Sequence, residues 1–229
     1  MLSPLLAMEV PPFRLTGTVY GALLNHRPLL EALGDAVNQP PHKGAPREPV
    51  LAIKPRNCLA ADGDPVVVPA GAAALEIGAT LGIVIGRCAS HIDAAQAMQY
   101  VAGYTIIADI SMPLAGHYRP AVRMKARDGF CPLGPAVVPA DKIANPDALA
   151  VQVFVDNQLV HSTTTGERIR PVAQLLADVS DFITLQAGDI MMLGVSAQAP
   201  QARAGQTVRI EIEGLGSLSN RLLAELEAS

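Results

Sequence analysis

The sequence predicts a β-rich α+β domain, and three observations carry that prediction. Nineteen glycines and nineteen prolines are spread along the 229 residues, which favours many short strands joined by turns. Half of the residues are apolar, so a sizeable core is available. A clear amphipathic helical pattern occurs in one stretch, 171–182, where apolar residues recur about every 3.6 positions behind Pro171.

Apolar and β-branched runs predict the strands. The run at 81–85 is continuously apolar and is closed by Gly86, which is typical of a strand buried on both faces. The runs at 150–155 and 158–161 are separated by Asp156 and Asn157, a pair that favours a hairpin turn. The remaining strands are expected at 16–24, 49–54, 66–68, 104–110, 188–193, 207–213 and 217–222.

Two further helices are expected, both of them short. One covers 27–37 and ends before the proline-rich stretch 39–49. The other covers 94–100, with Asp93 as its N-cap. The densely cationic segment 117–129 is expected to be loop-like. No repeat or low-complexity linker interrupts the chain, so we expect an N-terminal tail at 1–15 and one domain at 16–229.

Charge and cysteine content limit the possible functions. The net charge is −4 and no run of Lys or Arg suggests nucleic-acid binding, so small molecules or other protein chains are the expected partners. Three cysteines without a C-x-x-C spacing indicate neither a disulfide framework nor a structural zinc site. No stretch approaches the roughly 20 apolar residues of a membrane span, and no basic signal-peptide region precedes the first apolar run. A cytoplasmic location is therefore expected.

The strings GATLGIVIGR from Gly78 and YVAGYTIIADIS ending at 111 carry a family resemblance. Alternate residues of a strand share a face, and a neighbouring strand can add a third oxygen ligand to a divalent ion. The block resembles that of the fumarylacetoacetate hydrolase family, which implies a bound Mg²⁺ or Mn²⁺. Gly78 and Thr80 stand where the family has two Glu ligands, and Asp109 matches the family's Asp. The resemblance thus implies a weak or vacant metal site at Asp109, with Glu76 and Thr80 as doubtful ligands.

The resemblance extends from about 17 to 221. It includes the strings MKARDGFCPLGP, LQAGDIMMLG and GQTVRIEIEGLG, which occur in the family's order. It implies a fumarylacetoacetate-hydrolase-like fold, a mixed β-sandwich or roll with a few short helices. It also implies assembly as a homodimer or as a heterodimer with a homologous subunit.

The strings ALLNHR, IKPRN and HYRPAVRMKARDGFCP resemble a subgroup of this family. That subgroup implies a decarboxylase and isomerase acting on unsaturated 2-oxo or 2-hydroxy dicarboxylates in the breakdown of aromatic compounds such as 4-hydroxyphenylacetate. Such chemistry needs a fixed cation beside an enolate and a group that moves a proton. Lys125 is the expected stabilising cation, with Arg119 and Lys54 as carboxylate clamps. Asp109 could hold a metal or act as a base.

Two departures from the family pattern argue against hydrolysis. Leu29 stands at the position of the family's water-activating His, and Val195 replaces the substrate-facing Thr of a conserved turn string. His161 is a lone histidine, a type more often structural than catalytic. Two hypotheses remain open: a decarboxylase/isomerase subunit, favoured by the lysines, and a catalytically degenerate partner of a metal-complete homologue, favoured by Gly78 and Thr80.

Overall fold

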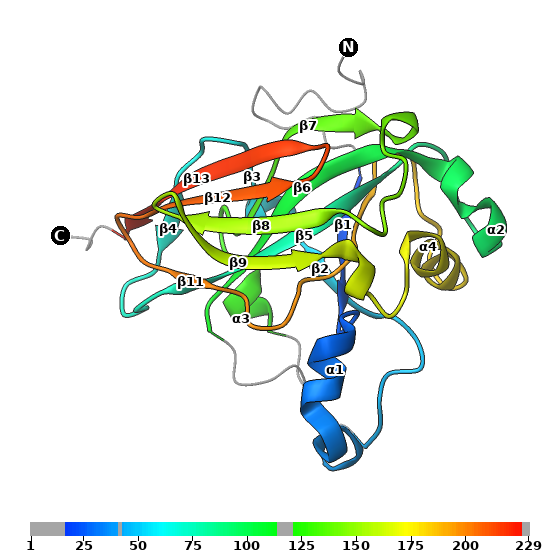
Figure 1. Cartoon of the computed structure of the whole chain (residues 1–229), viewed down its shortest axis with the longest axis horizontal. Coiled ribbons are helices and arrows are strands. Elements are labelled where there is room, and N and C mark those ends of the chain that lie inside the picture. Colours follow the sequence, from blue (N-terminus) through cyan, green and yellow to red (C-terminus); the bar gives the residue numbers. More distant parts are fainter. Residues whose placement is uncertain (1–16, 41–42, 114–120, 226–229) are drawn as a thin grey trace.

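The computed structural model describes residues 17–40, 43–113 and 121–225, and these form two packed β-sheets with a few short helices (Figure 1). The larger sheet has eight strands and the smaller has five. The larger sheet runs in the order β2 (Val50–Lys54), β1 (Val19–Leu23), β10 (Ile190–Met192), β5 (Leu75–Ile85), β6 (Val101–Ser111), β7 (Cys131–Pro139) and β3 (Leu59–Ala60), and β11 (Gln201–Ala202) pairs with β5. The smaller sheet runs in the order β4 (Val66–Val68), β13 (Gly216–Ala224), β12 (Thr207–Ile212), β8 (Ala150–Val155) and β9 (Gln158–Thr164).

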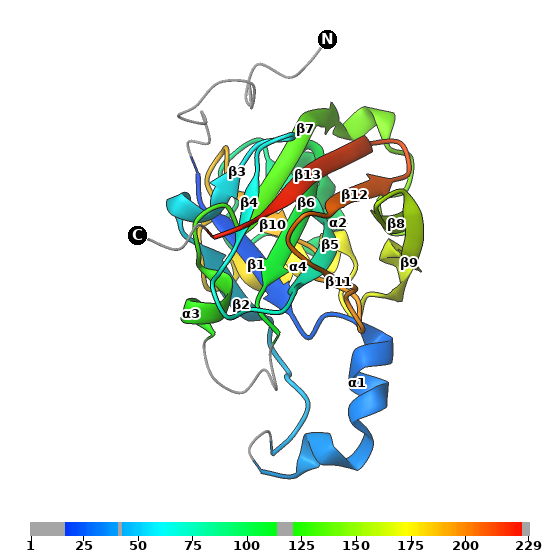
Figure 2. The ribbon, with the colours of Figure 1, turned by 90° about the vertical axis from the view of Figure 1, so that its left-hand side faces the viewer.

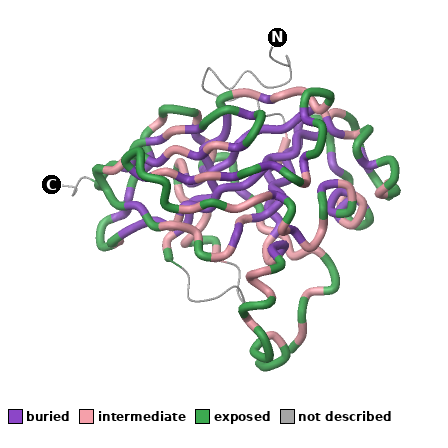
Figure 3. The backbone as a smooth tube through the Cα atoms, viewed as in Figure 1, coloured by how far each residue is buried: buried purple, intermediate pink, exposed green. Residues whose placement is uncertain are grey.

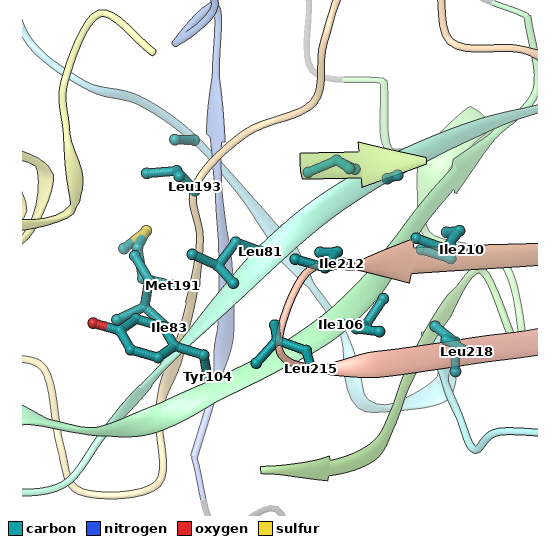
Figure 4. Packing of buried hydrophobic residues seen from close by; sticks show 14 of the residues in the cluster. Leu81, Ile83, Tyr104, Ile106, Met191, Leu193, Ile210, Ile212, Leu215 and Leu218 are labelled. Carbon is teal, nitrogen blue, oxygen red and sulfur yellow. The ribbon is translucent and has the colours of Figure 1, made fainter. Parts of the chain in front are cut away.

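The larger of two core clusters lies between the sheets and is centred on β5 and β6, and a smaller cluster is formed mainly by other side chains of the larger sheet. Ten of the eleven side-chain positions of β5 and ten of those of β6 are buried, which Figure 3 shows as the purple stretch through the middle of the molecule. Figure 4 shows Leu81 and Ile106 from this pair facing Ile210 and Leu218 of the other sheet. Because aromatic residues are scarce, aliphatic side chains fill this layer, each contributing about 1.5–3 kcal/mol on full burial.

The helices lie at the edges of the sheets. Helix α4 (Val172–Ser180) buries one apolar face and contacts α2 (Ala94–Ala97), which continues as a 3-10 turn at Met98–Tyr100. Helix α1 (Arg27–Leu33) has no buried residue and projects away from the sheets in both views (Figures 1 and 2). Helix α3 (Val122–Lys125) is a single turn. No helix in the described part of the chain is long and apolar enough to cross a membrane.

The predicted β-rich α+β class is confirmed, with corrections at the level of elements. The helix expected over 27–37 ends at Leu33, and a separate 3-10 helix (Gly34–Asn38) follows because Gly34 adopts a positive φ. Asp93 precedes α2 but makes no side-chain capping bond. The cationic segment contains α3, whereas it was expected to be loop-like. The expected N-terminal tail at 1–15 lies outside the described residues.

Strand β5 begins at Leu75, six residues before the apolar run that predicted it, and this extension places Gly78 beside Asp109 of β6. Strand β7 was not predicted because its Pro-Leu-Gly-Pro string is typical of a turn. It pairs with β6 through an irregular register, which accommodates the prolines. The hairpin between β8 and β9 is confirmed: Asp156 and Asn157 both have positive φ, 48° and 65°, as a type I′ turn requires.

Candidate functional site

Asp109 is a buried carboxylate held between two lysines. It lies on β6, where the alternation of the strand turns it toward the end of the sheet near α3. The Lys54 ammonium is 2.7 Å from Oδ1, and the Lys125 ammonium is 2.9 Å from Oδ2. Burial alone raises the pKa of Asp109, but the positive charges of Lys54 and Lys125 outweigh it and hold the pKa below its usual value. Asp109 is therefore an ionised anchor for two cations.

Lys54 lies behind Asp109 and is itself buried. Besides its contact with Asp109, Nζ donates to the backbone oxygens of Ile110 (3.3 Å), Lys125 (3.0 Å) and Phe130 (3.1 Å). Burial lowers the pKa of Lys54, but the charge of Asp109 more than reverses this and raises it. The contacts join β2, β6 and the end of α3, so Lys54 positions the segment that carries Lys125.

A small pocket of about 180 Å³ opens on the other side of this ion pair. Lys125 and Asp109 are part of its wall, and the side chain of Lys125 is 15% exposed where that of Asp109 is 5% exposed. The cation is thus the more exposed part of the pair at the pocket wall. The rest of the wall comes from Leu29, Glu76, Gly78, Ser111 and the loop 195–199 between β10 and β11.

The residues around Asp109 do not form a divalent-cation site. Gly78 has no side chain to offer, and a Cβ there would lie 2.6 Å from Cγ1 of Val195 and 2.8 Å from the Asp109 carbonyl oxygen. Thr80 exchanges two hydrogen bonds with the backbone of Gly194, at 3.0 and 3.1 Å, so its hydroxyl is occupied. Glu76 accepts a bond from Ser111 at 3.3 Å. Within the described ranges, no group of three His, Cys, Asp or Glu side chains is arranged to hold a metal ion.

A second polar cluster supports the loop that closes the pocket. His26 accepts a hydrogen bond at Nδ1 from the Ala197 amide (3.1 Å), so its proton is on Nε2, which lies 3.2 Å from Glu167. Burial lowers the pKa of His26, and the opposing effect of Glu167 does not reverse this. The lowered pKa favours the neutral ring. In the same cluster His161 Nε2 lies 2.7 Å from Oγ of Ser196, which is on the pocket wall.

The structure brings Asp109, Lys125 and Lys54 together. Lys54 was expected to be a carboxylate clamp, but it is buried behind Asp109 and is not among the described residues of the pocket wall. Arg119 lies outside the described residues. Leu29 is on the pocket wall, so the position of the expected water-activating His is apolar. Ser196 and His161 were not predicted as a pair. They are 35 residues apart, His161 on β9 and Ser196 in the loop between β10 and β11, and no local pattern in the sequence joins them.

The sequence profile for fumarylacetoacetate hydrolase (the C-terminal domain) matches residues 18–223. The chain belongs to the fumarylacetoacetate hydrolase family. It is 37% identical over 211 residues to the 4-hydroxyphenylacetate degradation bifunctional isomerase/decarboxylase of Salmonella dublin, covering 92% of this chain and 48% of the relative. The chain therefore spans about half the length of this relative and of two similar curated relatives from Escherichia coli.

Solved structures of family isomerases have the same fold. One is 5-carboxymethyl-2-hydroxymuconate delta-isomerase from Mycobacterium smegmatis, with a TM-score of 0.76 and 28% identity over 93% of this chain and 81% of that one. Another is 2-hydroxyhepta-2,4-diene-1,7-dioate isomerase from Mycobacterium marinum, with a TM-score of 0.73 and 28% identity over 92% of this chain and 76% of that one. These relatives are enzymes, which supports an enzymatic function for the family member described here.

Proposed function

We propose that this chain is an isomerase/decarboxylase subunit for unsaturated 2-oxo and 2-hydroxy dicarboxylates, working in aromatic catabolism. The observation that carries the proposal is the Lys125 ammonium, which faces the pocket while Asp109 holds it from behind at 2.9 Å. The names of two relatives support the substrate class, because one is a 4-hydroxyphenylacetate degradation bifunctional isomerase/decarboxylase and the other is a 2-hydroxyhepta-2,4-diene-1,7-dioate isomerase.

The chemistry requires a cation at the oxygen that becomes negative. When CO₂ leaves a carbon next to a conjugated 2-oxo unit, the electron pair of the broken C–C bond moves onto the carbonyl oxygen as an enolate. A fixed ammonium such as Lys125 stabilises that oxygen, or a carboxylate of the bound acid. Lys54 does not reach the pocket wall, and we assign it the positioning of Asp109 and α3.

The pocket disfavours hydrolysis. Two positions that could have supplied a base to activate water do not supply one, because Leu29 is apolar and both oxygens of Asp109 face lysines. Isomerisation and decarboxylation need no water as a reactant. The lining therefore agrees better with a proton shift or a loss of CO₂ than with cleavage by water.

The test is turnover by the purified chain. We expect loss of the ultraviolet absorbance of 2-hydroxyhepta-2,4-diene-1,7-dioate in the presence of EDTA. Lys125→Met should lower kcat/KM by about 100-fold or more, as expected for removal of a charge that stabilises the transition state. Lys142→Met is the matched control, because its side chain is 70% exposed and distant in the fold from the pocket wall. Full activity in Lys125→Met would remove Lys125 from the mechanism.

A second candidate function is that of a catalytically degenerate partner, and Gly78 and Thr80 favour it because neither is a metal ligand here. In that case the chain would stabilise a homologous, metal-complete domain, in keeping with its coverage of half of the bifunctional relative. Two activity measurements distinguish the candidate functions. A partner subunit shows no turnover alone, and Lys125→Met leaves the activity of the mixed complex unchanged.

A further inference from the structure

Ser196 and His161 form a hydrogen-bonded pair at the wall of the pocket. Ser196 belongs to the loop between β10 and β11 and is 7% exposed, and its Oγ lies 2.7 Å from Nε2 of His161. His161 belongs to β9, the outer strand of the smaller sheet. The pair therefore joins a hydroxyl on the pocket wall to an imidazole behind it, which is the arrangement that moves a proton between a bound molecule and a base.

The loop that carries Ser196 is held on both sides of it. On one side, Thr80 bonds both backbone groups of Gly194, and Asn25 donates to the carbonyl of Leu193 at 2.9 Å. On the other side, the Ala197 amide donates to His26. Because these contacts fix the backbone before and after Ser196, its hydroxyl keeps one position relative to His161. Such fixed geometry is what repeated proton transfer requires.

The other polar groups of the pocket wall are less suited to moving a proton. Asp109 is neutralised by two lysines, and Leu29 is apolar. Glu76 is the main competitor, because it is on the wall and accepts from Ser111, though at 3.3 Å rather than 2.7 Å. Any experiment must therefore separate His161 from Glu76.

We propose that Ser196 and His161 are the proton relay of this pocket. This inference rests on the proposed function and adds to it the group that moves the proton. Ser196 Oγ accepts the proton of the substrate's 2-hydroxyl as it passes its own to His161 Nε2. The O–H bond breaks, its electron pair moves along the conjugated chain, and a C–H bond forms at the far end when the relay returns the proton. Nothing is oxidised or reduced, and no co-reactant is needed.

The groups around His161 determine the direction in which its pKa is shifted. Glu167 faces it across the cluster, and His26 and Arg168 belong to the same group of side chains. Burial lowers the pKa of His161, and the negative charge of Glu167 opposes this without reversing it. The ring is therefore neutral at pH 7 and can accept a proton. Activity that depends on it is present at neutral pH and is lost only at a pH below the ordinary histidine value of about 6.5.

The experiment measures proton movement separately from isomerisation. Uptake of deuterium from D₂O into 2-oxoadipate, a diacid with no double bond to shift, is followed by NMR. Exchange at its C3 methylene proceeds through the 2-hydroxy enol, whose O–H proton is the one that the relay takes. We expect Ser196→Ala and His161→Gln each to slow exchange about 100-fold with unchanged KM. Ser196→Thr keeps the hydroxyl and should retain exchange within about tenfold of the wild type. The acid limb of the pH profile should disappear in His161→Gln.

His91→Gln is the matched control, since His91 is an exposed histidine paired with Asp181 on another face. Exchange within about threefold of the wild type in Ser196→Ala and His161→Gln would overturn the relay, as would a loss confined to Glu76→Gln. If the wild type isomerises the dienedioate and both variants do so equally well, only the relay fails. If the wild type exchanges deuterium through the pair but does not isomerise, only the proposed function fails. A wild-type chain that does neither would overturn both.

Discussion

Lys54 is a buried cation whose contacts are all internal, and its removal tests the ion pair directly. Lys54→Met leaves Asp109 buried with one partner instead of two, and leaves the carbonyls of Ile110, Lys125 and Phe130 without their shared donor. Breaking a buried pair in this way costs about 3–5 kcal/mol. We expect a loss of that size in the free energy of unfolding, measured by urea titration at pH 7.

Lys142→Met is the control for this measurement, because the 3.8 Å contact between Lys142 and Asp141 is exposed to solvent. Exposed pairs of this kind contribute about 0–1 kcal/mol. If Lys54→Met were no less stable than Lys142→Met, the ion pair between Lys54 and Asp109 would not be a feature of the folded protein.

Residues of the site could be predicted where the sequence has the same residue as the family motif. Residues that meet only because two distant segments pack together could not be predicted. Asp109 and Lys125 were placed at one site by the resemblance, and the structure puts them 2.9 Å apart. The hydrogen bonds of the Thr80 hydroxyl could not be predicted, because its partner Gly194 is 114 residues away in the sequence. The same holds for Ser196 and His161. In both cases a hydrogen bond joins a strand to a distant loop, and its formation depends on how the sheets pack, which the local sequence pattern does not encode.

At the level of elements, strands with uninterrupted apolar runs were predictable and those with turn residues were not. The run at 81–85 indicated β5 but not its start, because the preceding Gly78 and Thr80 weaken the pattern there. That extension matters, since it pairs Gly78 with Asp109. Strand β7 contains three prolines, a residue that is normally excluded from central strands, and they are tolerated here beside an irregular register with β6.

The hairpin of β8 and β9 offers a test at this scale, because its turn was predicted from the pair Asp156 and Asn157. Asn157 has a φ of 65°, which β-branched residues tolerate poorly. We expect Asn157→Val to lower the free energy of unfolding by about 1–2 kcal/mol and Asn157→Gly to leave it unchanged or raise it by a few tenths. Urea titration of the three proteins provides the measurement. Equal losses in both variants would mean that the Asn157 side chain, rather than its backbone conformation, stabilises the turn.

Metal affinity is a property of the whole folded chain, because any ion that binds only the native state raises the unfolding temperature. A metal ion that binds Asp109 would first have to displace Lys54 and Lys125. Gly78 has no side chain and the Thr80 hydroxyl is already hydrogen-bonded, so neither would add a ligand to the ion. We therefore expect 1 mM MgCl₂ or MnCl₂, added to EDTA-treated protein, to shift the thermal midpoint by less than about 2 °C, the shift that corresponds to a Kd near or above roughly 1 mM.

The alternative predicts a far larger effect, so a single calorimetric scan separates the two. A site with a Kd of about 1 μM would be saturated at 1 mM ion and would stabilise the native state by about 4 kcal/mol. For a chain of 229 residues that corresponds to a shift of about 8–16 °C. A metal-complete member of the family serves as the positive control. A large shift in the present chain would show that Asp109 releases its lysines to an ion, and the assignment of Lys125 as the cation of the pocket would then have to be withdrawn.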